Sequence, residues 1–344
     1  MIQPPIRVGF LGTGFIATYH SKSLKRGGAN IVRAGIFDPD MERAAAFAKA
    51  SGHIVCDSED DAIKSADAVF VCAWTSEHLR LVRKVVSAGK AVFCEKPLGP
   101  TLVDSQALTD AVIASGIVNQ VGLVLRHAPA YLWTRELITD PRAGRVMNVV
   151  FRDDQFIPIQ GYYASSWRSD VKRAGAGTLL EHSIHDVDML RFLVGEITEV
   201  GMRSSNFHGY PGIEDSVSAT LRFENGAVGT LSSIWHDNLT RPSQRRVEIF
   251  CERRTISIHG HEWFGPVEWH DADRTSGSLE GDELLERTAP LAVGATNPDI
   301  AFINAVANNI PAFPTVTTAL RSHVIVDAMY RSAGNNGATV TVDE

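Results

Sequence analysis

A glycine-rich turn near the start of the chain limits the folds open to it. The stretch VGFLGTGFIATYH places Gly12, Gly14 and Ala17 directly after an apolar run and before a helix-compatible run. Gly12 permits a tight turn, Gly14 lets the backbone approach a pyrophosphate, and Ala17 keeps the helix close to the strand. Such a pattern alone is weak evidence, because ordinary turns share it. As part of a strand-turn-helix unit it predicts a dinucleotide-binding fold.

The next strand-like run ends in an acid, within AGIFDPD. Asp38 lies 24 residues beyond Gly14, where a carboxylate can accept hydrogen bonds from the ribose hydroxyls of NAD. No arginine follows immediately to attract a 2′-phosphate, so NAD is favoured over NADP. Phe15 and Ile16, at the start of the helix, are further candidates for cofactor binding. The alternative is an ordinary turn with a solvated aspartate.

The first third of the chain alternates strand-like and helix-like runs. NIVRAGIFD, ADAVFVCAW and KAVFCE are nearly continuous apolar segments, which suit a parallel sheet covered on both faces. Helix-compatible stretches such as SEHLRLVRKVVSAGK lie between them and end at glycine. We therefore predict a doubly wound α/β domain, an N-terminal Rossmann domain over residues 1–124.

The pattern changes from about residue 145. Long strand-like runs follow, and ENGA within one of them supplies an Asn-Gly hairpin turn. The pattern predicts one helix over 178–194, a loop over 271–297, and two further helices over 298–309 and 316–333. Residues 125–344 are thus expected to form an α+β domain with an open, mostly antiparallel sheet, and two domains suit a chain of 344 residues.

Composition excludes several classes of protein. The net charge of −7 argues against nucleic acid as the main partner. Four cysteines without metal-type spacing indicate reduced core residues of a cytosolic protein. No apolar run approaches the roughly 18 residues that span a membrane, and the N-terminal stretch does not resemble a signal peptide. We expect a cytoplasmic protein without membrane or nucleic-acid partners.

The stretch AVFCEKPLGP places two charged residues directly after an apolar run. An apolar strand-like run ends at Glu95, Lys96 and Pro97, and burying charge is costly unless it is paired or used. In a doubly wound sheet, ligands bind outside the carboxyl ends of the strands, which favours a functional turn over a solvated one. The isomer of the Lys96–Pro97 bond does not follow from the sequence. The strand end CAWTSEH faces the same edge and adds cofactor-binding candidates: Ala73, Trp74, Thr75 and His78.

A second polar set lies in GAGTLLEHSIHDVDMLRFL. In a continuous helix Glu181, His185 and Asp188 share one face beside an apolar stripe. Spacing alone leaves two interpretations open, a satisfied structural network and a catalytic site. A zinc site at His182 and His185 lacks an obvious third ligand, so no metal is predicted.

Three motifs together resemble the glucose–fructose oxidoreductase / inositol dehydrogenase / rhizopine-catabolism (Gfo/Idh/MocA) family: Gly12-x-Gly14-x-x-Ala17, Glu95-Lys96-Pro97 and Glu181-x-x-x-His185-Asp186. The resemblance covers essentially the whole chain. It implies a Rossmann domain followed by an open-sheet domain that supports the site and usually the oligomer, here a homodimer or homotetramer. The exposed face of that sheet is the candidate interface.

The resemblance also implies residue roles. Lys96 is expected to reach the reacting hydroxyl of the substrate and also to contact the cofactor. His185 is expected to contact the substrate and to share the acid/base work. The family usually has aspartate where Glu181 stands, so whether this longer carboxylate orients His185 or holds a substrate hydroxyl stays open. Trp74 stands where proline is common, and its ring could pack on the cofactor or in the core. Glu95 is expected to place Lys96 or the cofactor.

Substrate binding is less constrained. QGYYASSWRSD contributes Tyr163, Trp167 and Arg168, which suit a polyhydroxylated ring or, equally, ordinary loop contacts. Arg126 follows the last Rossmann strand and is a candidate for cofactor or substrate contact, whereas His78 could also be structural.

The predicted function is an NAD-dependent dehydrogenase that oxidises a secondary hydroxyl of a sugar, anhydrosugar, glycoside or cyclitol such as inositol. A lysine made less basic by burial and nearby positive charge, and a histidine, can handle the proton. Two alternatives are a redox-neutral, NAD-dependent glycoside-cleaving enzyme of the same family and a catalytically inactive nucleotide-binding regulator.

Overall fold

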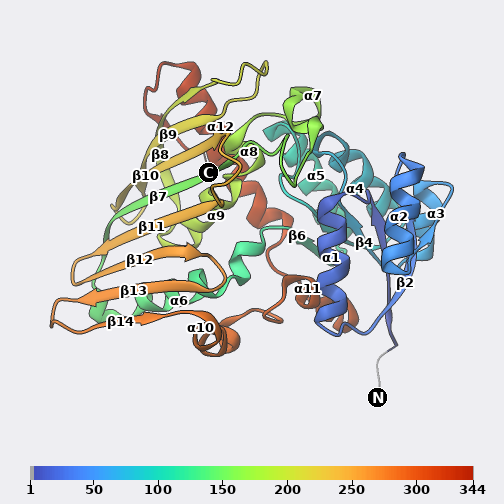
Figure 1. The fold of residues 1–344 in the computed structure, drawn as a ribbon, viewed down its shortest axis with the longest axis horizontal. Helices are drawn as coiled ribbons and strands as arrows, with labels where there is room; N and C mark the ends of the chain where they lie inside the picture. The colour runs from blue at the N-terminus through green and yellow to red at the C-terminus, as the bar shows by residue number, and fades with distance from the viewer. Residues whose placement is uncertain (1–3, 344) are drawn as a thin grey trace. The chain divides into compact units, whose positions relative to one another are not determined.

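The computed structural model describes residues 4–343, and the chain divides into two compact units (Figure 1). The first unit extends to Val124 and also includes Val293–Leu320. The second comprises Leu125–Ala292 and the chain from Arg321 onward. The predicted second domain, residues 125–344, includes residues 293–320, but this segment packs with the first unit.

The first unit is built on a six-stranded parallel sheet. Its strand order is β3-β2-β1-β4-β5-β6, the order of a doubly wound dinucleotide-binding fold. The strands are β1 (Ile6–Leu11), β2 (Ile31–Phe37), β3 (Ile54–Val55), β4 (Ala68–Val71), β5 (Ala91–Cys94) and β6 (Asn119–Val121). The helices are α1 (Phe15–Arg26), α2 (Met41–Ser51), α3 (Glu59–Ser65), α4 (His78–Ser87), α5 (Leu102–Ser115) and α11 (Pro298–Asn308).

Two apolar clusters cover the two faces of this sheet. One joins the strands to α3, α4 and α5, and the other joins them to α1, α2 and α11. On the second face Phe70 stacks on Phe93 with ring centroids 4.7 Å apart, and Phe302 of α11 meets both rings edge-on. These contacts are why residues 293–320 belong to the first unit, since Phe302 is fully buried among them.

The second unit is built on a nine-stranded sheet of order β14-β13-β12-β11-β7-β10-β9-β8-β15. β7 and β10 pair in parallel and all other pairs are antiparallel, which confirms the predicted sheet type. The strands are β7 (Val146–Phe156), β8 (Ile197–Ser205), β9 (Ser216–Phe223), β10 (Val228–His236), β11 (Gln244–Cys251), β12 (Arg254–His261), β13 (Gly265–Asp271), β14 (Ser276–Leu279) and β15 (Val340–Thr341).

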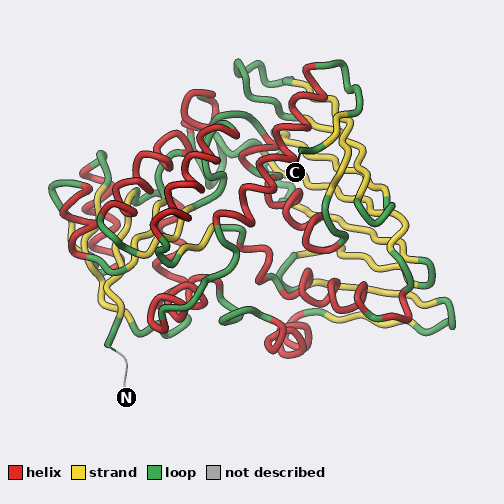
Figure 2. Tube along the Cα trace, turned by 180° about the vertical axis from the view of Figure 1, so that it is seen from behind, coloured by secondary structure: helices red, strands yellow, loops and turns green. Residues whose placement is uncertain are grey.

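Helices cover one face of this sheet, as the ribbon of Figure 1 and the rear view of Figure 2 both show. Along β9 and β11, buried and exposed residues alternate, so the opposite face is open. The helices are α6 (Pro129–Thr139), α7 (Val171–Ala174), α8 (Thr178–Glu181), α9 (Ile184–Leu193), α10 (Gly281–Thr288) and α12 (Val316–Gly334). The division between the units falls within α12.

Two sequence-based expectations for the second unit are wrong. Residues 178–194 do not form one helix, because the Thr178 carbonyl accepts from the N–H groups of both His182 and Ser183 and the Ser183 hydroxyl bonds Ser233 on β10. Residues 271–297 are not one loop, because β14 pairs with β13 and α10 buries Leu284. Among the residues described, no helix combines the length and apolarity needed to cross a membrane.

Candidate active site

The glycine turn lies at the switch point of the first sheet. It follows β1, next to β4, where the strand order reverses, and such points bind dinucleotides. Gly12 has φ +86°, and a Cβ there would lie 2.6 Å from the carbonyl oxygen of Cys72. A Cβ on Gly14 would meet nothing within 4 Å. Since no side chain caps α1 at Gly14, this open space at a helix N-terminus fits a pyrophosphate.

Asp38, at the end of β2, is held by several protein groups. Its carboxylate accepts hydrogen bonds from the N–H of Thr13 at 2.8 Å and from the N–H of Asp40 at 2.9 Å. Arg43 binds it through Nε at 3.0 Å and Nη2 at 2.6 Å. Burial raises the pKa of Asp38, but Arg43 and the backbone donors outweigh it and hold the pKa below its ordinary value.

Arg43 does not follow the acid immediately and was not among the predicted site residues. It lies one helical turn into α2, and the DPDMER stretch was the available signal. Its guanidinium pairs with Asp38, so the carboxylate that is expected to recognise a ribose also neutralises the nearest arginine.

The segment after β4 contacts the turn after β5. His78 is buried and its Nδ1 lies 2.8 Å from the carbonyl oxygen of Pro97, while its Nε2 lies 3.1 Å from that of Ala73. Burial lowers the pKa of His78, although both carbonyls oppose this. The structure therefore gives His78 a structural contact. Thr75 is buried and Trp74 is half-buried in the same segment.

Glu95, one of the two charged residues that follow β5, is ion-paired with a histidine. Glu95 is 7% exposed, and its Oε1 lies 2.8 Å from Nε2 of buried His20 on α1. The Glu95 carboxylate also accepts from the backbone N–H of Lys96 at 3.2 Å. Lys96 is half-buried, and its bond to Pro97 is cis. The Glu95 carboxylate is thus held by an internal ion pair rather than by solvent.

In the second unit, Glu181 and His185 lie on either side of the break between α8 and α9. Glu181 ends α8 and His185 lies in the first turn of α9, and both are buried. Glu214 fixes the start of α8, because its carboxylate accepts from the N–H groups of Gly177 and Leu179. Glu181 and His185 therefore remain neighbours in the chain without sharing a continuous helical face.

Glu181 contacts the predicted substrate loop through Arg168. The Nε of Arg168 donates to Glu181 at 2.5 Å, and the Arg168 guanidinium lies 4.4 Å from the Trp167 ring. Burial raises the pKa of Tyr163, whose ring lies 4.2 Å from that of Tyr162. Arg168 therefore connects Trp167 and Glu181, and the three side chains lie close enough together to contact one ligand.

A buried ionic cluster centred on Arg245 adjoins His185 and was not predicted. Arg245 on β11 binds Asp186 through Nε at 2.8 Å, Asp153 through Nη2 at 2.9 Å, and Glu262 through Nη1 at 3.1 Å. His182 lies 2.8 Å from Asp153. Burial raises the pKa of Asp186 to about 7, and the neighbouring Asp153 adds to this while Arg245 opposes it.

Arg126, a predicted cofactor or substrate contact, makes a bidentate ion pair within the protein. Its Nε and Nη2 lie 2.7 and 2.8 Å from the carboxylate of Asp188, which is fully buried. The guanidinium also lies 5.1 Å from the ring of Phe192. Asp188 is thus part of a structural pair, and the role of Arg126 toward a ligand stays a prediction.

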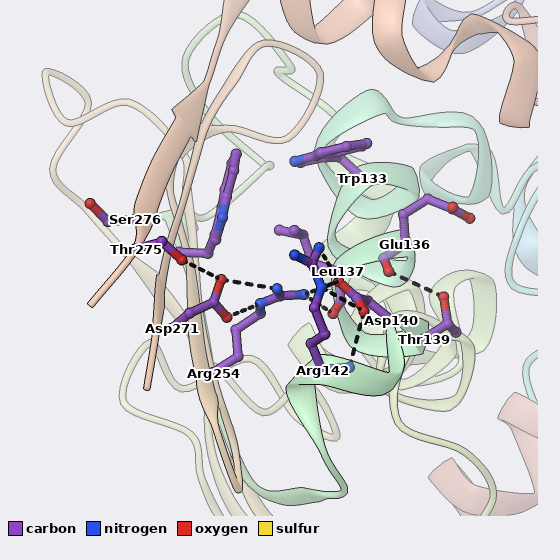
Figure 3. A pocket seen from close by; sticks show the side chains of 11 residues that line it. Trp133, Glu136, Leu137, Thr139, Asp140, Arg142, Arg254, Asp271, Thr275 and Ser276 are labelled. Atoms are coloured by element: carbon purple, nitrogen blue, oxygen red, sulfur yellow. Dashed lines mark hydrogen bonds and ion pairs between the residues drawn. The ribbon is translucent and has the colours of Figure 1, made fainter. Parts of the chain in front are cut away.

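One cavity of about 610 Å³ in the second unit is lined by none of the predicted site residues. Figure 3 shows it between α6 and the edge strands, with Arg254 at its base. The Arg254 guanidinium binds Asp271 and Asp140 and the Leu137 carbonyl. Because these contacts satisfy most of its donors, we interpret this ionic network as structural.

Comparison with known proteins agrees with this geometry. A family model described as an oxidoreductase family with an NAD-binding Rossmann fold matches residues 6–123, and a GFO/IDH/MocA C-terminal domain model matches residues 131–257. Inositol 2-dehydrogenase of Rhizobium meliloti is 31% identical over 338 residues, which cover 95% of this chain and 96% of that protein. Levoglucosan dehydrogenase of Pseudarthrobacter phenanthrenivorans is 29% identical over 82% of this chain and 78% of its own.

A solved structure of levoglucosan dehydrogenase in complex with NADH and levoglucosan is also similar. Its TM-score is 0.88 at 25% identity, over 99% of this chain and all of that one. Together with the glycine turn, these findings define an NAD-binding oxidoreductase that acts on CH–OH groups. The chain belongs to the Gfo/Idh/MocA family. The predicted family, fold class and cofactor are confirmed.

Proposed function

We propose that the protein oxidises a secondary hydroxyl of a sugar, anhydrosugar, glycoside or cyclitol, with Lys96 and His185 handling the proton. The observation that carries this proposal is the turn after β5, where Lys96 follows a buried, ion-paired Glu95 at the ligand-binding edge of the sheet. The relatives named for inositol and levoglucosan support a polyhydroxylated substrate.

The proposed roles follow from the bonds that must break. Oxidation removes a proton from the hydroxyl oxygen and a hydride from the carbon, and bound NAD supplies the hydride acceptor. Lys96 accepts the proton, and His185 shares its transfer. Holding the alcohol close to the group that takes its proton would lower the barrier.

Glu181 and the loop at 160–170 would hold the substrate. A ring with several hydroxyls presents apolar faces to aromatic side chains and hydroxyls to charged ones. Trp167, Arg168 and Glu181 form such a surface within the second unit, with Tyr163 nearby in the loop. Arg168 also explains how a glutamate can stand where the family usually has aspartate, because the longer side chain reaches the guanidinium.

The test is NADH formation, followed by its absorbance, with purified protein, NAD or NADP, and a panel of inositols, sugars, anhydrosugars and glycosides. We expect reduction of NAD with one substrate class and a preference over NADP. If NAD stays bound through purification and glycosides are cleaved without net NADH, the redox-neutral enzyme is the correct assignment. NAD binding without turnover of any substrate would support the inactive regulator.

We also propose that the open face of the nine-stranded sheet is the oligomer interface. Val150 and Val228 are exposed there, on the neighbouring strands β7 and β10. A homodimer or homotetramer is expected by light scattering, and a monomer at micromolar concentration would contradict this assignment.

A further inference from the structure

A buried chain of three side chains leads to the turn that carries Lys96. His20 on α1 lies between two carboxylates, with Nδ1 2.7 Å from Asp299 and Nε2 2.8 Å from Glu95. All three belong to the first unit, although Asp299 follows His20 by 279 residues. His20 and Asp299 are fully buried, and Glu95 is nearly so.

The central histidine is charged in this setting. Burial alone would lower the pKa of His20, but Asp299 and Glu95 outweigh it and raise the pKa to about 10. Both ring nitrogens then donate, one to each carboxylate. The ring is enclosed by Phe70 and Phe93, with centroids 5.4 and 4.9 Å away.

The geometry also limits where the Glu95 carboxylate can lie. The backbone of Gly122 packs directly against the Glu95 carboxylate, since a Cβ on Gly122 would lie 2.3 Å from Oε1 of Glu95. The other oxygen, Oε2, accepts from the backbone N–H of Lys96. The same turn is held on its far side by His78, which contacts the Pro97 carbonyl.

We propose that His20, held by Asp299, is a positioning residue that fixes Glu95 and, through it, the backbone of Lys96. His20 belongs to the helix that follows the glycine turn, so the helix that faces the pyrophosphate also orients the proposed base. This inference rests on the proposed catalytic role of Lys96, and it assigns a role to two residues outside the family motifs described above.

Two substitutions separate positioning from simple packing. The amide nitrogen of His20→Gln falls near the position of Nε2 and keeps a donor for Glu95. The amide nitrogen of His20→Asn falls near Nδ1 and keeps a donor only for Asp299. Positioning through Glu95 requires Gln to preserve what Asn loses. Because Asn also leaves a larger cavity than Gln, the effect at Lys96 is compared with the loss of stability in each variant.

The first measurement is amide hydrogen exchange at Lys96 in NAD-loaded protein, resolved by mass spectrometry, because it needs no substrate. We expect exchange at Lys96 to be about tenfold faster in His20→Asn and close to wild type in His20→Gln. The free energy of unfolding of both variants, by urea titration, shows whether either has lost its fold. Equal protection of Lys96 in wild type and His20→Asn would overturn the proposal.

The second measurement is steady-state kinetics with the substrate found in the panel. We expect kcat to fall about tenfold or more in His20→Asn and much less in His20→Gln, with little change in KM for NAD. An equal fall in both variants would overturn the positioning role. If Lys96→Ala keeps wild-type kcat, the proposed function is wrong instead, and the exchange result still reports on His20.

Discussion

Each unit of this protein has a buried cation, paired with acids, next to a proposed catalytic residue, and the two clusters differ in the cation. The first unit places a histidine between Glu95 and Asp299, and the second places Arg245 among Asp153, Asp186 and Glu262. Both adjoin a proposed catalytic residue, since Glu95 precedes Lys96 and Asp186 follows His185. Histidine can release its proton at alkaline pH, whereas arginine stays charged.

The difference shows where each cluster responds to pH. In the first, the pKa of His20 is raised to about 10, so the cation itself is the titrating group. In the second, burial and then the neighbouring Asp153 raise the pKa of Asp186 to about 7, although the permanent cation Arg245 opposes this. The first cluster therefore loosens as pH rises, while the second changes by ionising one of its acids.

The largest expected effect is the removal of the permanent cation. Arg245→Met leaves several buried acids uncompensated, which should lower the free energy of unfolding by about 3–5 kcal/mol. Urea unfolding measures it. The matched control is Arg246→Met, at the exposed neighbouring position of β11, which should change stability by no more than about 0.5 kcal/mol. Equal losses of stability in the two variants would show that the buried ion pairs of Arg245 do not stabilise the fold.

Filling the space behind Glu95 is the next test. In Gly122→Ala the new Cβ would lie 2.3 Å from Oε1 of Glu95, so the carboxylate must move away from His20, at a cost of about 1–3 kcal/mol. Urea unfolding, with kcat in parallel, measures this. Gly334→Ala is the control, since nothing lies within 4 Å of its Cβ. No loss in Gly122→Ala would mean that the carboxylate has more freedom than described.

The pH dependence of stability tests the charge of His20. The pKa of His20 is about 10 in the folded protein against an ordinary value of 6.5. Its contribution is therefore complete below pH 6.5 and is lost as pH rises toward 10. The slope is at most about 1.4 kcal/mol per pH unit. Between pH 6 and 10, the free energy of unfolding of wild type should fall relative to that of His20→Gln, with at most this slope. Parallel curves of free energy against pH would contradict a charged His20.

A surface ion cluster gives the smallest expected effect. Glu59 pairs with Arg80 at 2.7 Å and with Lys84 at 2.9 Å, and both cations are substantially exposed. Glu59→Gln should therefore cost only about 0–1 kcal/mol, and less at high salt. Thermal unfolding at low and high ionic strength measures it. A loss as large as that of Arg245→Met would remove the distinction between buried and exposed pairs.

Local patterns made much of the first unit predictable. Gly12 is recognisable because its turn, with positive φ, directly follows an apolar strand. Glu95 is recognisable because it ends an apolar run, so adjacent residues in the sequence were enough to find both. Arg43 was missed although it lies only five residues beyond Asp38. Asp299 could not be found, because nothing local links it to His20.

In the second unit, the sequence of β11 contains a pattern that indicates the buried Arg245. In QRRVEIFC, Arg245 alternates in phase with Val247, Ile249 and Cys251, all buried. A charge in phase with an apolar face of a strand indicates a buried ion pair. The break between α8 and α9 was not predictable in the same way, because it depends on Ser233 of a distant strand.

The most direct test of the account compares Lys96→Ala with wild type, both saturated with NAD, by the rate of NADH formation with the substrate identified in the panel. Lys90→Ala, at a half-buried lysine before β5, is the control. We expect Lys96→Ala, saturated with NAD, to lose about a hundredfold or more in kcat, and Lys90→Ala to be unchanged. Wild-type turnover by Lys96→Ala would contradict it.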